Sequence, residues 1–276
     1  MGTSRGVPPV IVIGMHRSGT GMMTRALESL GLFVGKDKDE NHESIFFQQI
    51  NDWLLRQCGG SWDHPQPISH LLRNAEIRRA TTDYIRHVLL TSPRAVSFLG
   101  WTRYVFTRDI ARLKVPWGWK DPRNTFTLPL WLDLFPDAHV VHIRRHGVDV
   151  ANSLVKRGRT QSIAQKLYNN TRILHWFRVK KGSFVMSPRC DSVRGAYSLW
   201  EEYVEQAEKH VVSLQNRAFE LTFEDLIAQP EGVVSELCRF CGLDADDFSM
   251  RRVAEGFNRD RAFAFQRDAR EQVLAE

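Results

Sequence analysis

The sequence predicts a single α/β domain of three layers, in which a central parallel sheet is flanked by helices. Two observations indicate this fold. Short apolar segments alternate along much of the chain with segments of helical periodicity, and these apolar segments lack the polar alternation of a half-exposed strand. Strands of that kind are buried on both faces of a parallel sheet. Because ligands bind at the carboxyl ends of such strands, we expect the loops after the strands to lie at one edge.

The N-terminal part begins with a strand, a turn and a helix. An apolar strand at Val10–Ile13 is followed by a glycine-containing turn at 14–21. Next comes a helix with apolar residues three or four positions apart, for which Gly31 is the expected stop. Residues 59–68 hold two glycines and two prolines, which predicts a loop. Further helices are expected at 45–55 and 70–90.

The rest of the chain continues this pattern, although residues 93–115 indicate no single structure. Strands are expected at 117–120, 138–143 and 218–223. Helices are expected at 128–135, 148–156, 161–179 and 192–214, with two or three short ones near the end. We expect residues 1–276 to form one domain, with 1–8 disordered and no packing assigned to 256–276.

Composition and charge disfavour several classes of protein. The chain has 38 Lys and Arg against 32 Asp and Glu, and this net charge of +6 favours anionic ligands. The sequence contains no dense Lys/Arg block of the kind that would indicate a nucleic-acid partner. It also contains no apolar run that approaches the roughly 18 residues of a membrane span. Residues 1–9 lack the apolar core of a signal peptide. Cys238 and Cys241 form a lone C-x-x-C, so we expect these cysteines to pack in the core rather than to bind a metal ion. We expect the protein to reside in the reducing cytoplasm.

The turn after the first strand has the composition of an anion-binding loop, with the sequence GMHRSGTG at residues 14–21. Glycines let backbone N–H groups point inward, and the following helix adds its dipole. The glycine spacing matches a P-loop, so we expect a P-loop-like fold. However, Thr20 and Gly21 stand where an ATPase has Lys followed by Ser or Thr. The cation is instead Arg17, inside the loop, and its guanidinium can bind phosphate or sulfate oxygens.

Two segments resemble the nucleotide-binding signatures of sulfotransferases that use 3′-phosphoadenosine 5′-phosphosulfate (PAPS), notably the bacterial and carbohydrate-type members. GMHRSGT at 14–20 resembles the loop that binds the 5′-phosphosulfate. RHGVDVANS at 145–153 resembles the turn that binds the 3′-phosphate through an Arg and a Ser eight residues later. PAPS is anionic at both ends of one adenosine, so two separated anion sites suit it, whereas an ordinary mononucleotide needs one.

Two further segments agree with this family. WKDPR at 119–123, followed by FPDA, resembles its central segment, and FEDL at 223–226, followed by FCGL, resembles its Tyr-Glu-Asp-Leu segment. The likeness spans about residues 9–245. The chain departs from the family at Gly147, where Pro is common, and at Phe223, where Tyr is usual.

The resemblance implies transfer of a sulfuryl group from PAPS to a hydroxyl or amine, releasing 3′-phosphoadenosine 5′-phosphate, without a metal ion. Positioning and fixed positive charge dominate such in-line transfers, and we expect Arg17 and Lys120 to supply that charge. The implied donor-binding residues are Arg17, Ser18, Gly19, Thr20, Gly21, Met22, Arg145, Ser153 and Phe223.

The base that takes the acceptor's proton is expected in the segment NHES at 41–44. The resemblance favours Glu43, whereas His42 has a free pKa closer to neutrality. Glu40 and Asp39 are fallback candidates. Cytosolic animal members close on the 3′-phosphate with a C-terminal Arg-Lys-Gly segment that is not matched here, and Arg259 and Arg261 are candidate replacements.

Two other functions fit parts of the sequence. A small-molecule kinase would use ATP and magnesium, with Asp121 as a metal-holding carboxylate, although the Lys missing after Gly19 counts against it. A catalytically inactive relative would keep the nucleotide sites without a working base. The acceptor stays open between a small molecule, a carbohydrate and a lipid, and the oligomeric state is not indicated. Aromatic residues that could line its pocket, or belong to the core, are Trp53, Trp62, Trp101, Tyr104, Trp176 and Phe177.

Overall fold

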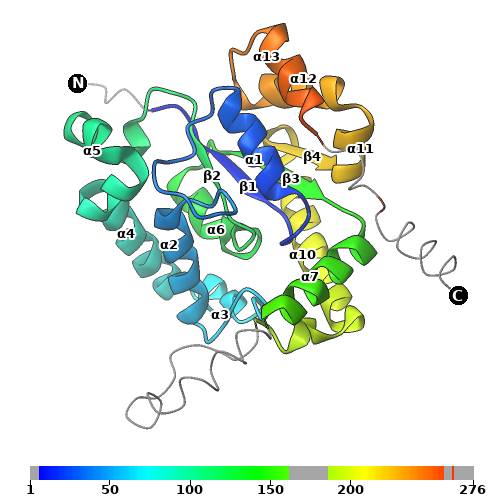
Figure 1. Cartoon of the computed structure of the whole chain (residues 1–276). Helices are drawn as coiled ribbons and strands as arrows, with labels where there is room; N and C mark the ends of the chain where they lie inside the picture. The colour runs from blue at the N-terminus through cyan, green and yellow to red at the C-terminus, as the bar shows by residue number, and fades with distance from the viewer. Residues whose placement is uncertain (1–5, 162–185, 258–262, 264–276) are drawn as a thin grey trace, which may run out of the picture.

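The centre of the protein is a sheet of four parallel strands in the order β2-β1-β3-β4 (Figure 1). The computed structural model describes residues 6–161, 186–257 and 263. The strands are β1 (Val10–Ile13), β2 (Gly118–Lys120), β3 (His139–Arg144) and β4 (Ala218–Thr222). The inner strand β1 pairs with β2 and β3, and Val12 is opposite Lys120 on one side and Val141 on the other. The predicted α/β class, with a parallel sheet, is confirmed.

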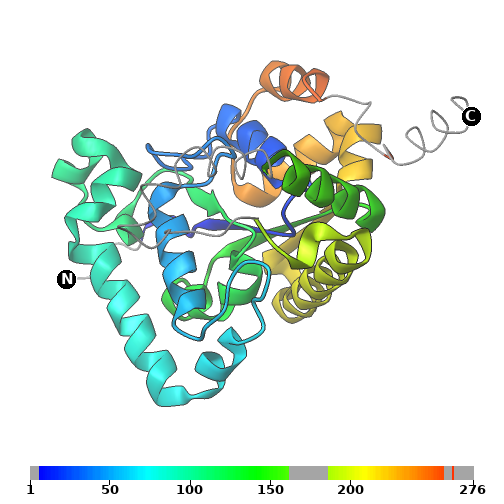
Figure 2. The same cartoon turned by 60° about the horizontal axis from the view of Figure 1, so that its bottom comes forward.

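Helices cover both faces of the sheet and so complete the three layers (Figures 1 and 2). Ile11 and Ile13 of β1 pack on one face against α2, α6, α7 and α10. Val10 and Val12 point to the other face, against α1, α11 and α12, as the twofold period of a strand requires. The helices are α1 (Thr20–Ser29), α2 (Ile45–Arg56), α3 (Ile68–Arg73), α4 (Ala75–Thr91), α5 (Val96–Phe106), α6 (Asn124–Leu134), α7 (Gly147–Gln161), α10 (Val193–Leu214), α11 (Phe223–Ala228), α12 (Pro230–Cys241) and α13 (Asp247–Glu255).

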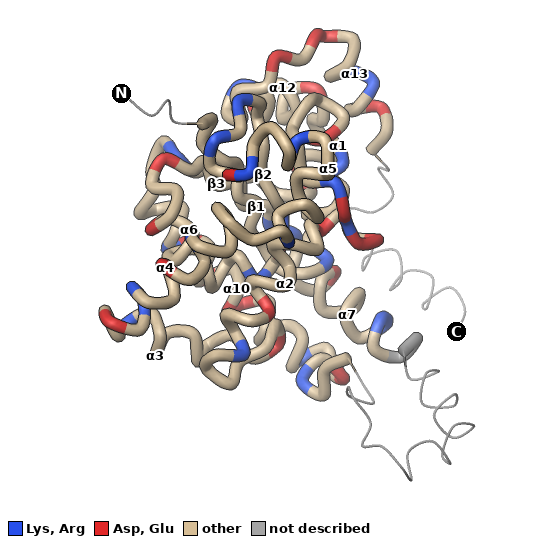
Figure 3. The backbone as a smooth tube through the Cα atoms, turned by 90° about the vertical axis from the view of Figure 1, so that its left-hand side faces the viewer, with Lys and Arg blue, Asp and Glu red and all other residues tan. Residues whose placement is uncertain are grey.

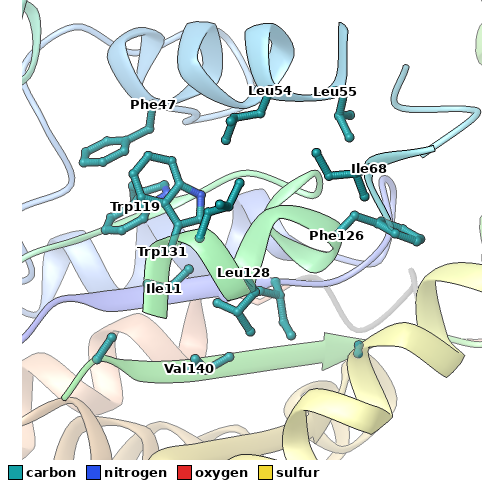
Figure 4. Close-up of a cluster of buried hydrophobic side chains, with 14 of the residues drawn as sticks. Ile11, Phe47, Leu54, Leu55, Ile68, Trp119, Phe126, Leu128, Trp131 and Val140 are labelled. Atoms are coloured by element: carbon teal, nitrogen blue, oxygen red, sulfur yellow. The ribbon is translucent and has the colours of Figure 1, made fainter. Parts of the chain in front are cut away.

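Aromatic rings dominate the core between the sheet and α2 and α6 (Figure 4). The ring of Phe47, from α2, stacks on that of Trp119, from β2, with centroids 4.0 Å apart. Trp131, from α6, meets Trp119 edge-on at 5.0 Å. Large buried rings of this kind contribute strongly to stability, so this cluster ties the short strand β2 to two helices.

Several boundaries differ from the sequence-based prediction for local reasons. The expected helix at 70–90 is two helices, because Asn74 ends α3 and its side chain caps the N-terminus of α4. Helix α6 begins at Asn124 rather than at 128, and it accommodates Pro129. Strand β4 ends at Thr222, whose hydroxyl caps α11, so Phe223 begins a helix.

Other predicted segments need separate comment. Residues 93–115 form α5 between two short 3₁₀ turns, Pro93–Ala95 and Ile110–Arg112. Most of the helix expected at 161–179 lies outside the described residues. Of the segment 1–8, residues 1–5 lie outside the described residues, and the N–H of Val7 donates to the carbonyl oxygen of Leu113 at 2.8 Å. Among the described residues, no helix combines the length and apolarity required to cross a bilayer.

A buried asparagine joins α2 to β2 and α6, and its removal provides a test of this packing. The amide of Asn51 donates to Asp121 at 2.9 Å and to Asn124 at 2.7 Å, while its oxygen accepts from Trp131 at 3.0 Å. We expect Asn51→Ala to lower the free energy of unfolding by about 3 kcal/mol, because these buried partners lose their hydrogen bonds. Urea denaturation followed by circular dichroism measures the loss.

The matched control is Gln57→Ala, at the exposed end of the same helix. This substitution should change the free energy of unfolding by no more than about 0.5 kcal/mol. Equal effects of the two substitutions would contradict the role given to Asn51.

Candidate functional site

A pocket of about 250 Å³ lies at the carboxyl ends of the strands. Each of the four strands is followed by residues that contribute to its wall, as the parallel topology requires. Five of the lining residues are Lys or Arg and two are Glu, so the pocket favours an anionic ligand. The lining residues are His16, Arg17, Gly19, Thr20, Gly21, Met22, Arg25, Glu40, Asn41, Glu43, Lys120, Pro122, Arg145, Arg157 and Phe223.

The loop after β1 has the backbone of an anion cradle. Gly19, at the N-terminus of α1, has a φ of 92°, and a Cβ there would lie 2.5 Å from the ring of Phe223. Only glycine fits that close approach without strain. Ser18 is buried, and its hydroxyl has no hydrogen-bond partner among the described residues. Such a buried hydroxyl is normally satisfied, so Ser18 is suited to a ligand oxygen.

The turn after β3 meets the first loop directly. Arg17 donates from Nε to the hydroxyl of Ser153 in α7 at 2.8 Å. Arg145 donates to the carbonyl oxygen of Arg17 at 3.4 Å and to Asp149 at 3.2 Å. Its guanidinium also lies over the ring of Phe223, 4.7 Å from the centroid, within cation–π distance. The two predicted anion-binding segments are therefore neighbours at one edge of the sheet.

A buried ion pair forms the third part of the wall. The ammonium of Lys120, at the end of β2, donates to Glu43 Oε1 at 2.9 Å and to the carbonyl oxygen of Asn41 at 2.7 Å. The two side chains are 2% and 7% exposed. Glu43 Oε2 also accepts from Gln48 at 3.0 Å and lies 3.8 Å from Arg123. A buried carboxylate needs such partners, and here they hold it at the pocket.

The four candidate bases occupy different places. Glu43 and Glu40 line the pocket, whereas His42 and Asp39 do not. His42 has a φ of 59° and pairs with Glu28 of α1 at 3.2 Å. Burial and the charge of Arg25 lower the pKa of His42. Asp39 holds the turn, since its carboxylate accepts from the backbone N–H of Glu43 at 2.8 Å. The structure therefore brings Glu43, and not His42, beside Lys120.

Asp121, the carboxylate that the kinase alternative would use for magnesium, is fully buried. It accepts from Arg123 Nε at 2.9 Å and from Asn51 at 2.9 Å. Its oxygens thus serve the protein's own side chains. Among the described residues, no group of three or more His, Cys, Asp or Glu side chains is arranged to hold a metal ion.

His16 lines the pocket but was not singled out from the sequence. Its Nε2 is buried without a hydrogen-bond partner among the described residues, and its ring meets that of Trp62 edge-on at 4.9 Å. Burial lowers the pKa of His16 well below its usual value, and the charges of Arg123 and Lys120 act in the same direction. The imidazole is therefore neutral near pH 7, with one ring nitrogen available to a ligand.

Arg25 was also missed as a site residue, and Arg157 lines the pocket as well. Arg25 stands four residues after Gly21 in α1. Residues four apart lie on the same face of a helix, and this spacing could have placed Arg25 at the pocket. Arg157 lies one helical turn after Ser153 on α7, with the same spacing. Arg259 and Arg261, the candidates for a C-terminal contact, lie outside the described residues.

Comparison with known proteins adds a family assignment. The model of the family described as "Sulfotransferase family" matches residues 8–247. Comparison with curated proteins finds no match.

Several solved structures are similar at low identity. The sulfotransferase domain from the curacin biosynthetic pathway shares 15% identity over 93% of this chain and 80% of its own, with a TM-score of 0.46. Sulfotransferase STF1 from Mycobacterium tuberculosis H37Rv shares 15% over 91% of this chain and 71% of its own, with a TM-score of 0.46. A sulfotransferase from Alicyclobacillus acidocaldarius shares 18% identity over 88% of this chain and 85% of its own, with a TM-score of 0.44.

The ion pair of Lys120 and Glu43 makes a specific prediction for stability. Lys120→Met leaves the Glu43 carboxylate buried without its closest cation, so we expect the free energy of unfolding to fall by about 3–5 kcal/mol. The double variant Lys120→Met/Glu43→Gln should lose less than the sum of the single losses, because no unpaired charge remains. Urea denaturation of the ligand-free protein gives all three values.

Lys209→Met is the control, since Lys209 pairs with Glu205 on the exposed face of α10. The loss there should be below about 1 kcal/mol. Strictly additive losses at Lys120 and Glu43 would show that the two side chains are not coupled.

Proposed function

Because this chain belongs to the sulfotransferase family, we propose that it transfers a sulfuryl group from PAPS to a hydroxyl or amine of an acceptor. The single observation that carries the proposal is the meeting of two arginine-bearing turns at one basic pocket. Arg17 follows β1 and Arg145 follows β3, and they are joined by the hydrogen bond from Arg145 to the Arg17 carbonyl. A ligand with anionic groups at both ends can engage both turns at once.

The residues present fit such a donor. The glycine at position 19 leaves room where a Cβ would collide, and the buried hydroxyl of Ser18 lacks a partner among the described residues. We assign the 5′-phosphosulfate to the first loop, through Arg17 and the backbone N–H groups of residues 18–22. We assign the 3′-phosphate to Arg145 with Ser153, and Phe223 supports Arg145 from below its guanidinium plane.

When bound, PAPS supplies the sulfuryl group. The sulfur forms a bond to the acceptor oxygen or nitrogen while its bond to the phosphate oxygen breaks, and 3′-phosphoadenosine 5′-phosphate leaves. Arg17 and Lys120 stabilise the negative charge on the transferred group. The ammonium of Lys120 has three N–H donors. Among the described residues, Asn41 and Glu43 accept from two of them, so we assign the third to the ligand.

We assign the acceptor's proton to Glu43. Its carboxylate lies in the pocket wall beside Lys120, whereas His42 is turned toward Glu28. Lys120 then has two roles, because it stabilises the transferred group and also holds the base in place. A positioned base of this kind contributes about 10²–10⁴-fold to the rate.

The acceptor class stays a choice among a small molecule, a carbohydrate and a lipid. Of the aromatic candidates, Trp62 is in ring contact with the pocket-lining His16, and we propose that it borders the acceptor side. We place the reaction in the cytoplasm, where all four cysteines can remain the free thiols seen in the structure.

The donor assignment predicts selective stabilisation by 3′-phosphorylated nucleotides. We expect 3′-phosphoadenosine 5′-phosphate to raise the melting temperature more than adenosine 5′-phosphate or ATP with magnesium, because only the first ligand engages both turns. Arg145→Ala should weaken binding about 10–100-fold by removing a charge-assisted hydrogen bond. Thermal-shift titration measures both effects.

Arg144→Ala is the neighbouring control, since Arg144 pairs with Glu208 of α10 and does not line the pocket. The control should keep the preference for the 3′-phosphate. Stronger stabilisation by ATP with magnesium would favour the kinase alternative, and an equal response to all three nucleotides would remove the donor assignment.

The base assignment predicts different effects of two adjacent substitutions. Glu43→Gln should lower kcat about 10²–10⁴-fold, while His42→Asn stays within a few-fold of wild type. The readout is formation of 3′-phosphoadenosine 5′-phosphate from PAPS, with hydroxyl and amine acceptors first screened on the wild type. Thermal shift with the same product shows whether each variant still binds the nucleotide. Loss of turnover in His42→Asn alone would transfer the role to His42.

A further inference from the structure

The second half of α5 exposes a group of apolar side chains at the surface. Phe106 is 84% exposed, Trp101 73% and Val105 65%. Tyr104, half-buried beside them, meets Trp101 edge-on with centroids 6.4 Å apart. We call these four residues the α5 patch. Several large apolar side chains exposed this strongly within six residues are a feature of interaction sites.

The patch results from a kink within α5. Gly100 has a φ of 72°, in the left-handed region, and breaks the helical geometry. Phe98 and Leu99, before the kink, are buried in the core. After the kink, Trp101, Val105 and Phe106 are exposed, whereas Tyr104 still packs against the core. This arrangement presents the rings of Trp101 and Phe106 to the surroundings.

Basic residues flank the patch in the sequence. Residues 94–115 hold five Lys or Arg and one acidic residue, Asp109, a net charge of +4 (5 − 1). Arg103 lies over the ring of Phe33 at 4.0 Å, and Arg112 pairs with Asp109 at 3.2 Å. The exposed basic residues of this segment are Arg94, Arg103, Arg108, Arg112 and Lys114.

We propose that the α5 patch docks this protein onto an anionic lipid surface. Trp and Tyr rings prefer the headgroup level of a bilayer, and Lys or Arg beside them attract anionic lipids. A second copy of the chain fits less well, because a twofold interface would bring two segments of charge +4 together.

The four residues of the α5 patch are not among those that line the pocket. In Figures 1 and 2, α5 lies at the outer edge of the molecule, beyond β2, whereas α7 and α11 flank the opposite edge. Figure 3 views the molecule from the side on which α5 lies, with Lys and Arg in blue. Docking therefore does not require the anion-binding turns, and it stands or falls independently of the proposed reaction.

The test is co-sedimentation of the full chain with vesicles. Wild type should bind vesicles of phosphatidylcholine with phosphatidylserine and bind much less to phosphatidylcholine alone, with added salt weakening the binding. Trp101→Ser/Phe106→Ser should weaken binding about tenfold or more, because two rings no longer enter the interface. Arg103→Gln/Arg108→Gln should reduce the difference between the two vesicles.

Phe248→Ser is the control, since Phe248 on α13 is 75% exposed and lies outside residues 94–115. It should bind vesicles like wild type, and melting temperatures show that each variant is folded. Absence of wild-type binding to the anionic vesicles, or an equal loss in Phe248→Ser, would overturn the proposal. Lipid-free dimerisation in sedimentation velocity, abolished by Trp101→Ser/Phe106→Ser, would replace it with a second copy as the occupant.

Discussion

The wall of the pocket depends on one electrostatic constraint: a lysine buried at the end of a short strand must be paired. Lys120 is 2% exposed, and its partner Glu43 comes from a turn 77 residues earlier. Glu43 in turn engages Gln48 of α2, and Asp121 next to Lys120 engages Asn51 of the same helix. Burying these charges unpaired would cost several kcal/mol. Pairing therefore fixes the turn, the helix and the strand end in one arrangement.

The apolar core and this polar network support each other. Trp119 is one residue before Lys120, and its ring is stacked on Phe47 of the same α2 that carries Asn51 and Gln48. Packing places α2, and α2 then presents amides to the charges at the strand end. The network also excludes Asp121 from the pocket. Five Lys or Arg residues remain in the lining of the cavity, and their charge favours an anionic ligand.

The sequence predicted the features that depend on local patterns. Apolar runs gave the strands, and glycine with arginine in the turn after β1 predicted an anion loop. The partnership of Glu43 with Lys120 is invisible locally, because chain folding alone brings the two together. The different placement of His42, which pairs with Glu28, and of Glu43, which lines the pocket, likewise depends on tertiary contacts. Periodicity indicated no single structure for residues 93–115. In the structure, the non-helical backbone of Gly100 interrupts α5 in this segment.

The adjacency of β1 and β3 has a consequence for how ligand preference can evolve. The turns that follow these two strands carry Arg17 and Arg145, and hydrogen-bonded neighbours in a sheet lie about 4.8 Å apart. The backbone ladder thus sets the spacing of the two strand ends from which these turns begin. Replacing side chains can tune how strongly each end is gripped. Another strand order would separate these two turns.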